Sequence, residues 1–139
     1  MRDANVKRAS VIHTILYRAT NGLVGRRLVH NDMLLLTTTG STTGHPHTVP
    51  LLYLQNGDRL IVVASYGGRP DHPQWYTNLV AEPEVAVQIL GDHYRARAST
   101  MSPRERTEWW PRVVEAYDGY HDYQSKTTRE IPLIWLATV

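Results

Sequence analysis

Short apolar stretches bounded by turn-forming residues recur along the chain, and this pattern predicts about six β-strands. Asn56-Gly57 and Gly91-Asp92 are two-residue turn sequences, so the strands beside them should pair antiparallel. An antiparallel sheet of this size tends to close on itself, because closure removes its edges. The 139 residues are therefore predicted to form a single α+β domain built on a small β-barrel. The expected strands are 33–39, 48–55, 59–65, 84–90, 93–101 and 131–137.

The most informative stretch begins with the apolar run Leu60 to Ala64, which is typical of a strand buried on both faces. Ser65 to Gly68 follows, and its two glycines allow a sharp turn and a close approach of a ligand to the main chain. Asp71 is a candidate helix cap, with Pro73 in the first turn. Such a strand–turn–helix connection is either a ligand-binding rim, through its unpaired N–H groups, or an ordinary connection.

Helical spacing of apolar residues predicts an amphipathic helix over residues 5–20. Its polar side carries basic residues, so it either lies on a membrane surface or packs on its own domain. A second helix should start at Ser102, because Ser102 and Glu105 have the spacing of a capping box and Pro103 suits the first helical position. Pro111 is expected to bend or restart this helix.

Tyr117, Tyr120 and Tyr123 recur at intervals of three residues. Each supplies a flat apolar ring and a phenolic O–H group. Two interpretations remain open from the spacing alone, namely the wall of a substrate pocket and a packed aromatic cluster.

Composition and charge exclude several classes of function. The formal net charge is only +2 and no dense Lys/Arg run occurs, so nucleic-acid binding is not expected. The absence of cysteine excludes disulfides and thiolate catalysis, and it is compatible with a cytoplasmic location. No apolar stretch is long enough to span a membrane. His45, His47 and His72 have no carboxylate at a recognisable ligand spacing, so no metal site is expected.

Several motifs, matched in order and spacing, closely resemble the deazaflavin (F420)-dependent nitroreductase family. The matching segments are Leu34 to Gly40, Gly44 to Pro46, Val49 to Leu51, Val62 to Ser65, Gly67-Gly68, Pro73 to Tyr76, Asn78-Leu79 and Tyr117 to Gln124. The resemblance implies a split β-barrel of the FMN-binding type, a homodimer and a reduced 8-hydroxy-5-deazaflavin coenzyme. It also implies hydride transfer to an activated C=C bond, a quinone or a nitro compound, and hence a small apolar or aromatic substrate.

The resemblance also assigns site residues. Ser65, Tyr120 and Tyr123 are implied to be catalytic, as hydroxyl groups that orient the acceptor or supply a proton. The implied substrate pocket comprises Tyr117, Tyr120, Tyr123 and Trp75. The implied coenzyme-binding residues are Ser41, Thr42, His47, Ala64, Ser65, Tyr66, Gly67, Gly68 and Trp75.

The sequence departs from the family at the positions that normally meet the phosphate and acidic tail of the coenzyme. Ser41, Thr42, His47 and Tyr66 stand where Arg or Lys is usual. Arg69 is a cation that could replace part of this charge. Two functions are therefore carried forward, a deazaflavin-dependent reductase and a coenzyme-independent protein that reuses the pocket as an isomerase, cyclase or binder of an apolar molecule. A flavin mononucleotide protein of the same fold is a third alternative.

Overall fold

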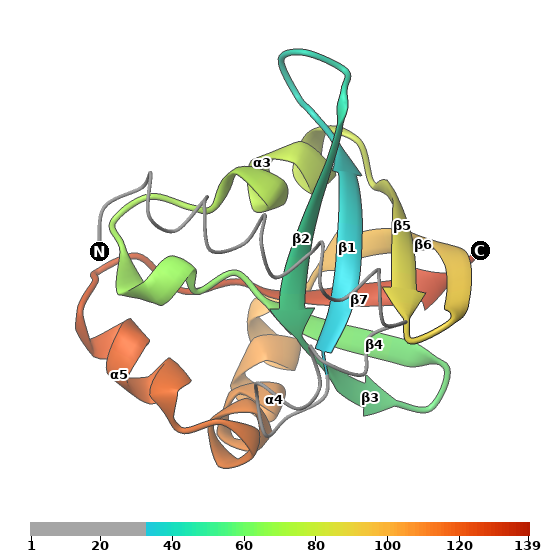
Figure 1. Ribbon diagram of the computed structural model, residues 1–139. Helices are drawn as coiled ribbons and strands as arrows, with labels where there is room; N and C mark the ends of the chain where they lie inside the picture. Colours follow the sequence, from blue (N-terminus) through green and yellow to red (C-terminus); the bar gives the residue numbers. More distant parts are fainter. Residues whose placement is uncertain (1–32) are drawn as a thin grey trace.

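The computed structural model describes residues 33–139, and the helix predicted over residues 5–20 lies outside them. Within residues 33–139, seven strands form one antiparallel sheet in the order β2-β1-β5-β6-β7-β4-β3, accompanied by three helices and a short 3-10 turn, η1 (Figure 1). The strands are β1 (Met33–Thr39), β2 (Pro46–Leu52), β3 (Leu54–Asn56), β4 (Arg59–Val63), β5 (Glu84–Ile89), β6 (Asp92–Thr100) and β7 (Leu133–Thr138). The remaining elements are η1 (Tyr66–Gly68), α3 (Gln74–Ala81), α4 (Pro103–Ala116) and α5 (Gly119–Ser125).

The sheet curls into a split barrel because its two edge strands are neighbours in the sequence. β2 ends at Leu52 and β3 begins at Leu54, yet these strands stand at opposite ends of the strand order. Only Tyr53 separates them, so the two edges of the sheet must come together. The single strand predicted over 48–55 is thus wrong in one respect, since the chain breaks at Tyr53 and passes from one edge to the other. Pro50 lies in edge strand β2, as its missing N–H group requires.

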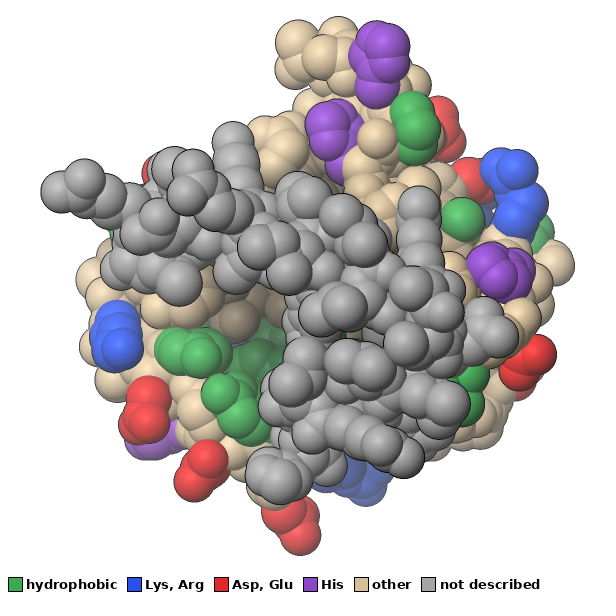
Figure 2. All heavy atoms as spheres, viewed as in Figure 1, with side chains coloured by type: hydrophobic (Ala, Val, Ile, Leu, Met, Phe, Trp, Pro, Cys, Tyr) green, Lys and Arg blue, Asp and Glu red, His purple; other side chains and the backbone are tan. Residues whose placement is uncertain are grey.

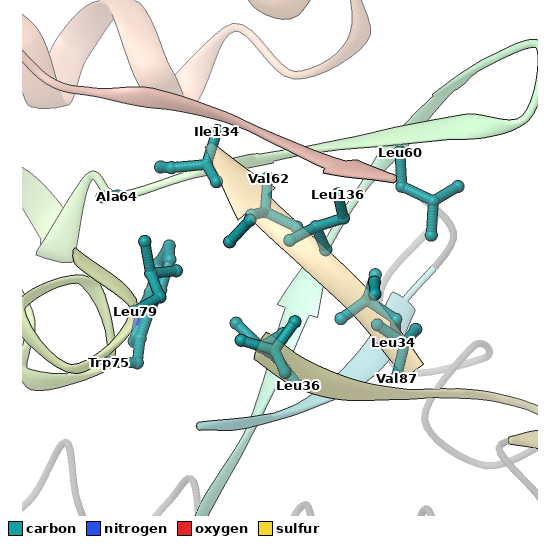
Figure 3. Close-up of a cluster of buried hydrophobic side chains, with 13 residues drawn as sticks. Leu34, Leu36, Leu60, Val62, Ala64, Trp75, Leu79, Val87, Ile134 and Leu136 are labelled. Atoms are coloured by element: carbon teal, nitrogen blue, oxygen red, sulfur yellow. The ribbon is translucent and has the colours of Figure 1, made fainter. Parts of the chain in front are cut away.

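Strand β4 is buried on both faces, which confirms the interpretation of its apolar run. Leu60 and Val62 point into the barrel core, whereas Ile61 and Val63 belong to a second cluster. Figure 3 shows the barrel core, in which Trp75 and Leu79 of α3 meet side chains from the strands and so close one end of the barrel. The second cluster lies between the sheet and the helices α4 and α5.

The capping box at the start of α4 is confirmed. The Glu105 N–H group donates to Ser102 Oγ at 3.2 Å, and the Ser102 N–H group donates to Glu105 Oε1 at 2.9 Å. Pro111 lies inside α4, which continues through it to Ala116. The cap predicted for α3 is wrong, because Pro73 occupies the N-cap position and no side chain of residues 33–139 caps the helix. None of α3, α4 and α5 has the length and apolarity that crossing a membrane requires.

Candidate active site

An open cavity of about 860 Å³ lies where four segments of the chain meet. Strand β2 forms one wall through residues such as His47 and Val49. The turn after β4, the first turn of α3 and the helix α5 form the others, and α5 contributes Tyr123. A cavity of this size accommodates a small-molecule or cofactor ligand.

The turn after β4 presents main chain to this cavity. Ser65, Tyr66 and Gly67 all line it. Tyr66 has φ +48°, Gly67 has φ +64° and Gly68 has φ +78°, so three consecutive residues are left-handed. This conformation is strained for a residue with a side chain, and such strain concentrates at ligand sites. Within residues 33–139, the N–H groups of Ser65 and Gly67 have no hydrogen-bond partner, so both remain able to bind a ligand.

The two glycines of the turn have different roles. Space around Gly67 is open, and no atom lies within 4 Å of a Cβ built there. A Cβ on Gly68 would collide with the main-chain oxygen of Tyr123 and would lie 3.0 Å from its Cα atom. Gly68 is therefore required so that α5 can pack against the turn, whereas Gly67 faces the cavity. The sequence predicted ligand approach at both positions, and the structure brings only Gly67 to the cavity wall.

The three tyrosines form a packed cluster, of which only Tyr123 reaches the cavity wall. The Tyr117 and Tyr120 ring centroids are 5.0 Å apart in an edge-to-face arrangement, and the Tyr117 and Tyr123 hydroxyl oxygens are 3.4 Å apart. The hydrogen bond with Tyr117, together with partial burial, raises the pKa of Tyr123 to about 12. Burial also raises the pKa of Tyr120, which is 6% exposed, and its hydroxyl has no hydrogen-bond partner in the described part of the chain.

Proteins of similar sequence show the family to which this chain belongs. The family model described as F420H(2)-dependent quinone reductase matches residues 9–137. The chain belongs to this family. An F420H(2)-dependent quinone reductase of Mycobacterium tuberculosis (strain ATCC 25618 / H37Rv) is 38% identical over 130 residues, which cover 91% of this chain and 87% of the relative.

Two solved structures share the fold of this chain, and the first is described as a reductase that depends on the same coenzyme. The F420-H2 dependent reductase FDR-A superposes with a TM-score of 0.69 at 39% identity, covering 78% of this chain and 98% of its own. A second solved chain, described as a domain-swapped dimer, superposes with a TM-score of 0.71 at 34% identity, covering 97% of this chain and 99% of its own. The split barrel expected from the resemblance is thus confirmed.

Two positions at which the family usually carries cations do not line the cavity. Ser41 and Thr42 lie exposed at the tip of the β1–β2 hairpin. The Ser41 N–H group donates to Asn78 Oδ1 at 3.0 Å, and Gln74 Nε2 lies 3.5 Å from Ser41 Oγ. Gln74 and Asn78 themselves line the cavity, so Ser41 lies directly behind its rim, whereas Thr42 lies farther out along the hairpin.

The other two positions at which the family usually carries cations, His47 and Tyr66, do line the cavity, and so does Arg69. Histidine side chains stand on the hairpin that projects at the top of Figure 2, where β1 and β2 meet. The Arg69 guanidinium carbon lies 5.0 Å from the centre of the Tyr66 ring. Ala64 is fully buried in the barrel core and does not reach the cavity surface. Among residues 33–139, no three His, Asp or Glu side chains lie close enough to hold a metal ion.

Sequence reasoning missed Arg129, in the loop between α5 and β7. Its guanidinium donates to the carbonyl oxygens of Ala64 at 3.0 Å and Ser65 at 2.8 Å. It also donates to the carbonyl oxygen of Arg69 at 3.2 and 3.1 Å. These partners lie 60 to 65 positions away in the sequence, so no local sequence pattern predicts the contacts of Arg129.

Proposed function

We propose that this chain is an F420H2-dependent reductase that delivers a hydride to a quinone or a related electron-poor acceptor. The observation that carries the proposal is the cavity in which main-chain N–H groups without partners among residues 33–139, the indole of Trp75 and the Tyr123 phenol meet. The family membership supports the reductase over a coenzyme-independent isomerase, cyclase or binder.

The residues present fit a deazaflavin coenzyme. The Ser65 and Gly67 N–H groups are donors suited to the polar edge of a ring system, and Trp75 supplies a flat apolar surface. Arg69 offers a guanidinium for phosphate or carboxylate oxygens. The first turn of α3 lines the same cavity, and its N–H groups add further positive potential.

The bound coenzyme would supply the hydride, and the chain would supply position and a proton. Two-electron reduction of a quinone to a hydroquinone needs one hydride and one proton at an oxygen. Tyr123 and Tyr120 both have raised pKa values, so both phenols are protonated at neutral pH and are hydrogen-bond donors. Tyr123 touches the cavity and would contact the acceptor directly. The buried hydroxyl of Tyr120 lacks a partner among residues 33–139. It would donate a hydrogen bond once the acceptor or a water brings an oxygen within reach.

Titration of the purified chain with the deazaflavin coenzyme, followed by its fluorescence, tests binding. Oxidation of the reduced coenzyme with menadione as the acceptor tests turnover. Tyr123→Phe and Tyr120→Phe should bind the coenzyme like the wild type. If one of these phenols is the sole proton donor, its Phe variant should turn over about 10²–10⁴-fold more slowly. Tyr94→Phe, on strand β6, is the matched control and should leave both measurements unchanged. Absence of binding and turnover in the wild type would refute the reductase and favour the coenzyme-independent alternative.

We also propose a homodimer, because a solved relative that covers nearly the whole chain is a domain-swapped dimer. Light scattering after size-exclusion chromatography measures the mass in solution. A mass near 15.9 kDa, that of one chain, would refute the proposal.

A further inference from the structure

The Arg129 guanidinium is fully engaged behind the turn that follows β4. All five of its N–H groups have acceptors, which are the carbonyl oxygens of Ala64, Ser65 and Arg69 together with His72 Nδ1. Three of these acceptors are neutral main-chain oxygens of the turn. Arg129 does not line the cavity, so it contacts the turn from the side away from the ligand.

The geometry of the peptide group connects this contact to the cavity. In a trans peptide, the carbonyl oxygen and the following N–H group point in opposite directions. When Arg129 holds the Ala64 oxygen, it fixes the Ser65 N–H group on the opposite side, and its bond to the Ser65 oxygen does the same for the N–H group of Tyr66. Ser65 and Tyr66 line the cavity. The guanidinium therefore determines the direction in which these donors point.

Arg129 is itself held in place by α5. Gln124 Nε2 donates to the Arg129 carbonyl oxygen at 2.8 Å, and the Arg129 N–H group donates to Thr127 Oγ1 at 3.1 Å. Gln124 lies next to Tyr123, whose main chain packs on Gly68. Two sets of contacts therefore fix α5 relative to the turn after β4, one through Arg129 and one through Gly68.

We infer that Arg129 is a positioning residue of the coenzyme site, which orients the peptide groups of Ser65 and Tyr66, and with them the Ser65 donor, without touching the ligand. The inference rests on the proposed function for the identity of the ligand, but the orientation of the turn does not depend on it. A guanidinium suits this role, because its five N–H groups lie in one rigid plane and reach several carbonyls at once.

The test compares Arg129→Met and Arg129→Lys with the wild type. Arg59→Met is the matched control, because the guanidinium of Arg59, at the far end of β4, also makes a tertiary contact, with its central carbon 3.8 Å from the centre of the Trp135 ring. Thermal unfolding shows how much stability each variant loses. Fluorescence titration measures coenzyme affinity, and two-dimensional ¹⁵N–¹H spectra of the ligand-free protein report the N–H groups of Ser65 and Tyr66.

Misorientation of the Ser65 donor, one neutral hydrogen bond, should raise the coenzyme Kd of Arg129→Met by roughly 2- to 13-fold. Arg129→Lys keeps the charge but loses the planar set of five N–H donors. Its coenzyme Kd should therefore lie between those of Arg129→Met and the wild type. The cross-peaks of Ser65 and Tyr66 should move in both variants. Arg59→Met should lose stability with an unchanged Kd and unchanged cross-peaks at the turn.

The outcomes separate this inference from the proposed function. If the wild type binds the coenzyme and a folded Arg129 variant binds equally well, the positioning role is refuted. If the wild type does not bind, the proposed function fails, and the spectra of the ligand-free variants decide whether Arg129 orients the turn. Unmoved cross-peaks in Arg129→Lys, which retains the charge and is the milder change, would overturn the inference.

Discussion

Replacement of Gly68 by alanine should destabilise the protein by clash and by strain. The new Cβ would overlap the Tyr123 carbonyl oxygen and lie 3.1 Å from Lys126 Cβ. Relief of such overpacking costs about 1–3 kcal/mol. The φ of +78° adds about 1–2 kcal/mol for a residue with a side chain. The free energy of unfolding should therefore fall by about 2–5 kcal/mol in Gly68→Ala.

Gly67→Ala is the matched control for this prediction. Gly67 has φ +64° but no atom within 4 Å of the position that the new methyl group would take, so it carries the strain without the clash. Urea unfolding, followed by tryptophan fluorescence, should show a loss of only about 1–2 kcal/mol for this variant. Equal losses for Gly67→Ala and Gly68→Ala would refute the assignment of Gly68 to helix packing. Gly68→Ala should also weaken coenzyme binding, because relief of the clash moves Tyr123.

Three further predictions concern charge, pH and helix capping. Ser41→Arg with Thr42→Lys should tighten coenzyme binding and steepen its decrease with salt, because exposed charge attraction is screened; titrations at two ionic strengths measure this, and an unchanged salt slope would contradict it. Burial and then the charge of Arg129 lower the pKa of His72 below its usual 6.5. Below pH 6.5 the unfolded chain therefore binds more protons than the folded one, and the contribution of His72 to stability is lost as the pH falls. Unfolding of His72→Gln across this range should show a weaker pH dependence than unfolding of the wild type. Ser102→Ala removes the cap of α4 and should cost about 1 kcal/mol in urea unfolding, with coenzyme affinity unchanged.

Local sequence patterns predicted most of the fold, because turns, caps and short apolar stretches are local features. The Asn56-Gly57 hairpin and the capping box at Ser102 appear as predicted. The break at Tyr53 was not predictable from local pattern, since residues 48–55 read as one continuous strand. That break follows from barrel closure, which depends on the pairing of strands far apart in the sequence.

The site was predictable only in part. The resemblance located Ser65, Gly67 and Trp75, and the structure brings them to one cavity with Tyr123. It gave no sign that Gly68 faces a helix, because a glycine motif reads the same whether a ligand or a main chain approaches it. Nor did it indicate Arg129, whose contacts depend on tertiary structure. Local motifs thus identify groups that touch a ligand more readily than groups that hold those groups in place.

The structure also revises the expected cost of the missing cations. If three charge-assisted hydrogen bonds were lost at about 1.5–3 kcal/mol each, coenzyme affinity would fall by about 3–6 decades. Of the four replaced positions, only His47 and Tyr66 line the cavity, so cations at positions 41 and 42 would attract the coenzyme through screened charge rather than through direct hydrogen bonds. Arg69 lines it as well, and under the proposed function its guanidinium would offset one of the two remaining losses. We therefore expect a net loss of about one direct charge-assisted hydrogen bond, or about 1–2 decades in affinity for the proposed coenzyme.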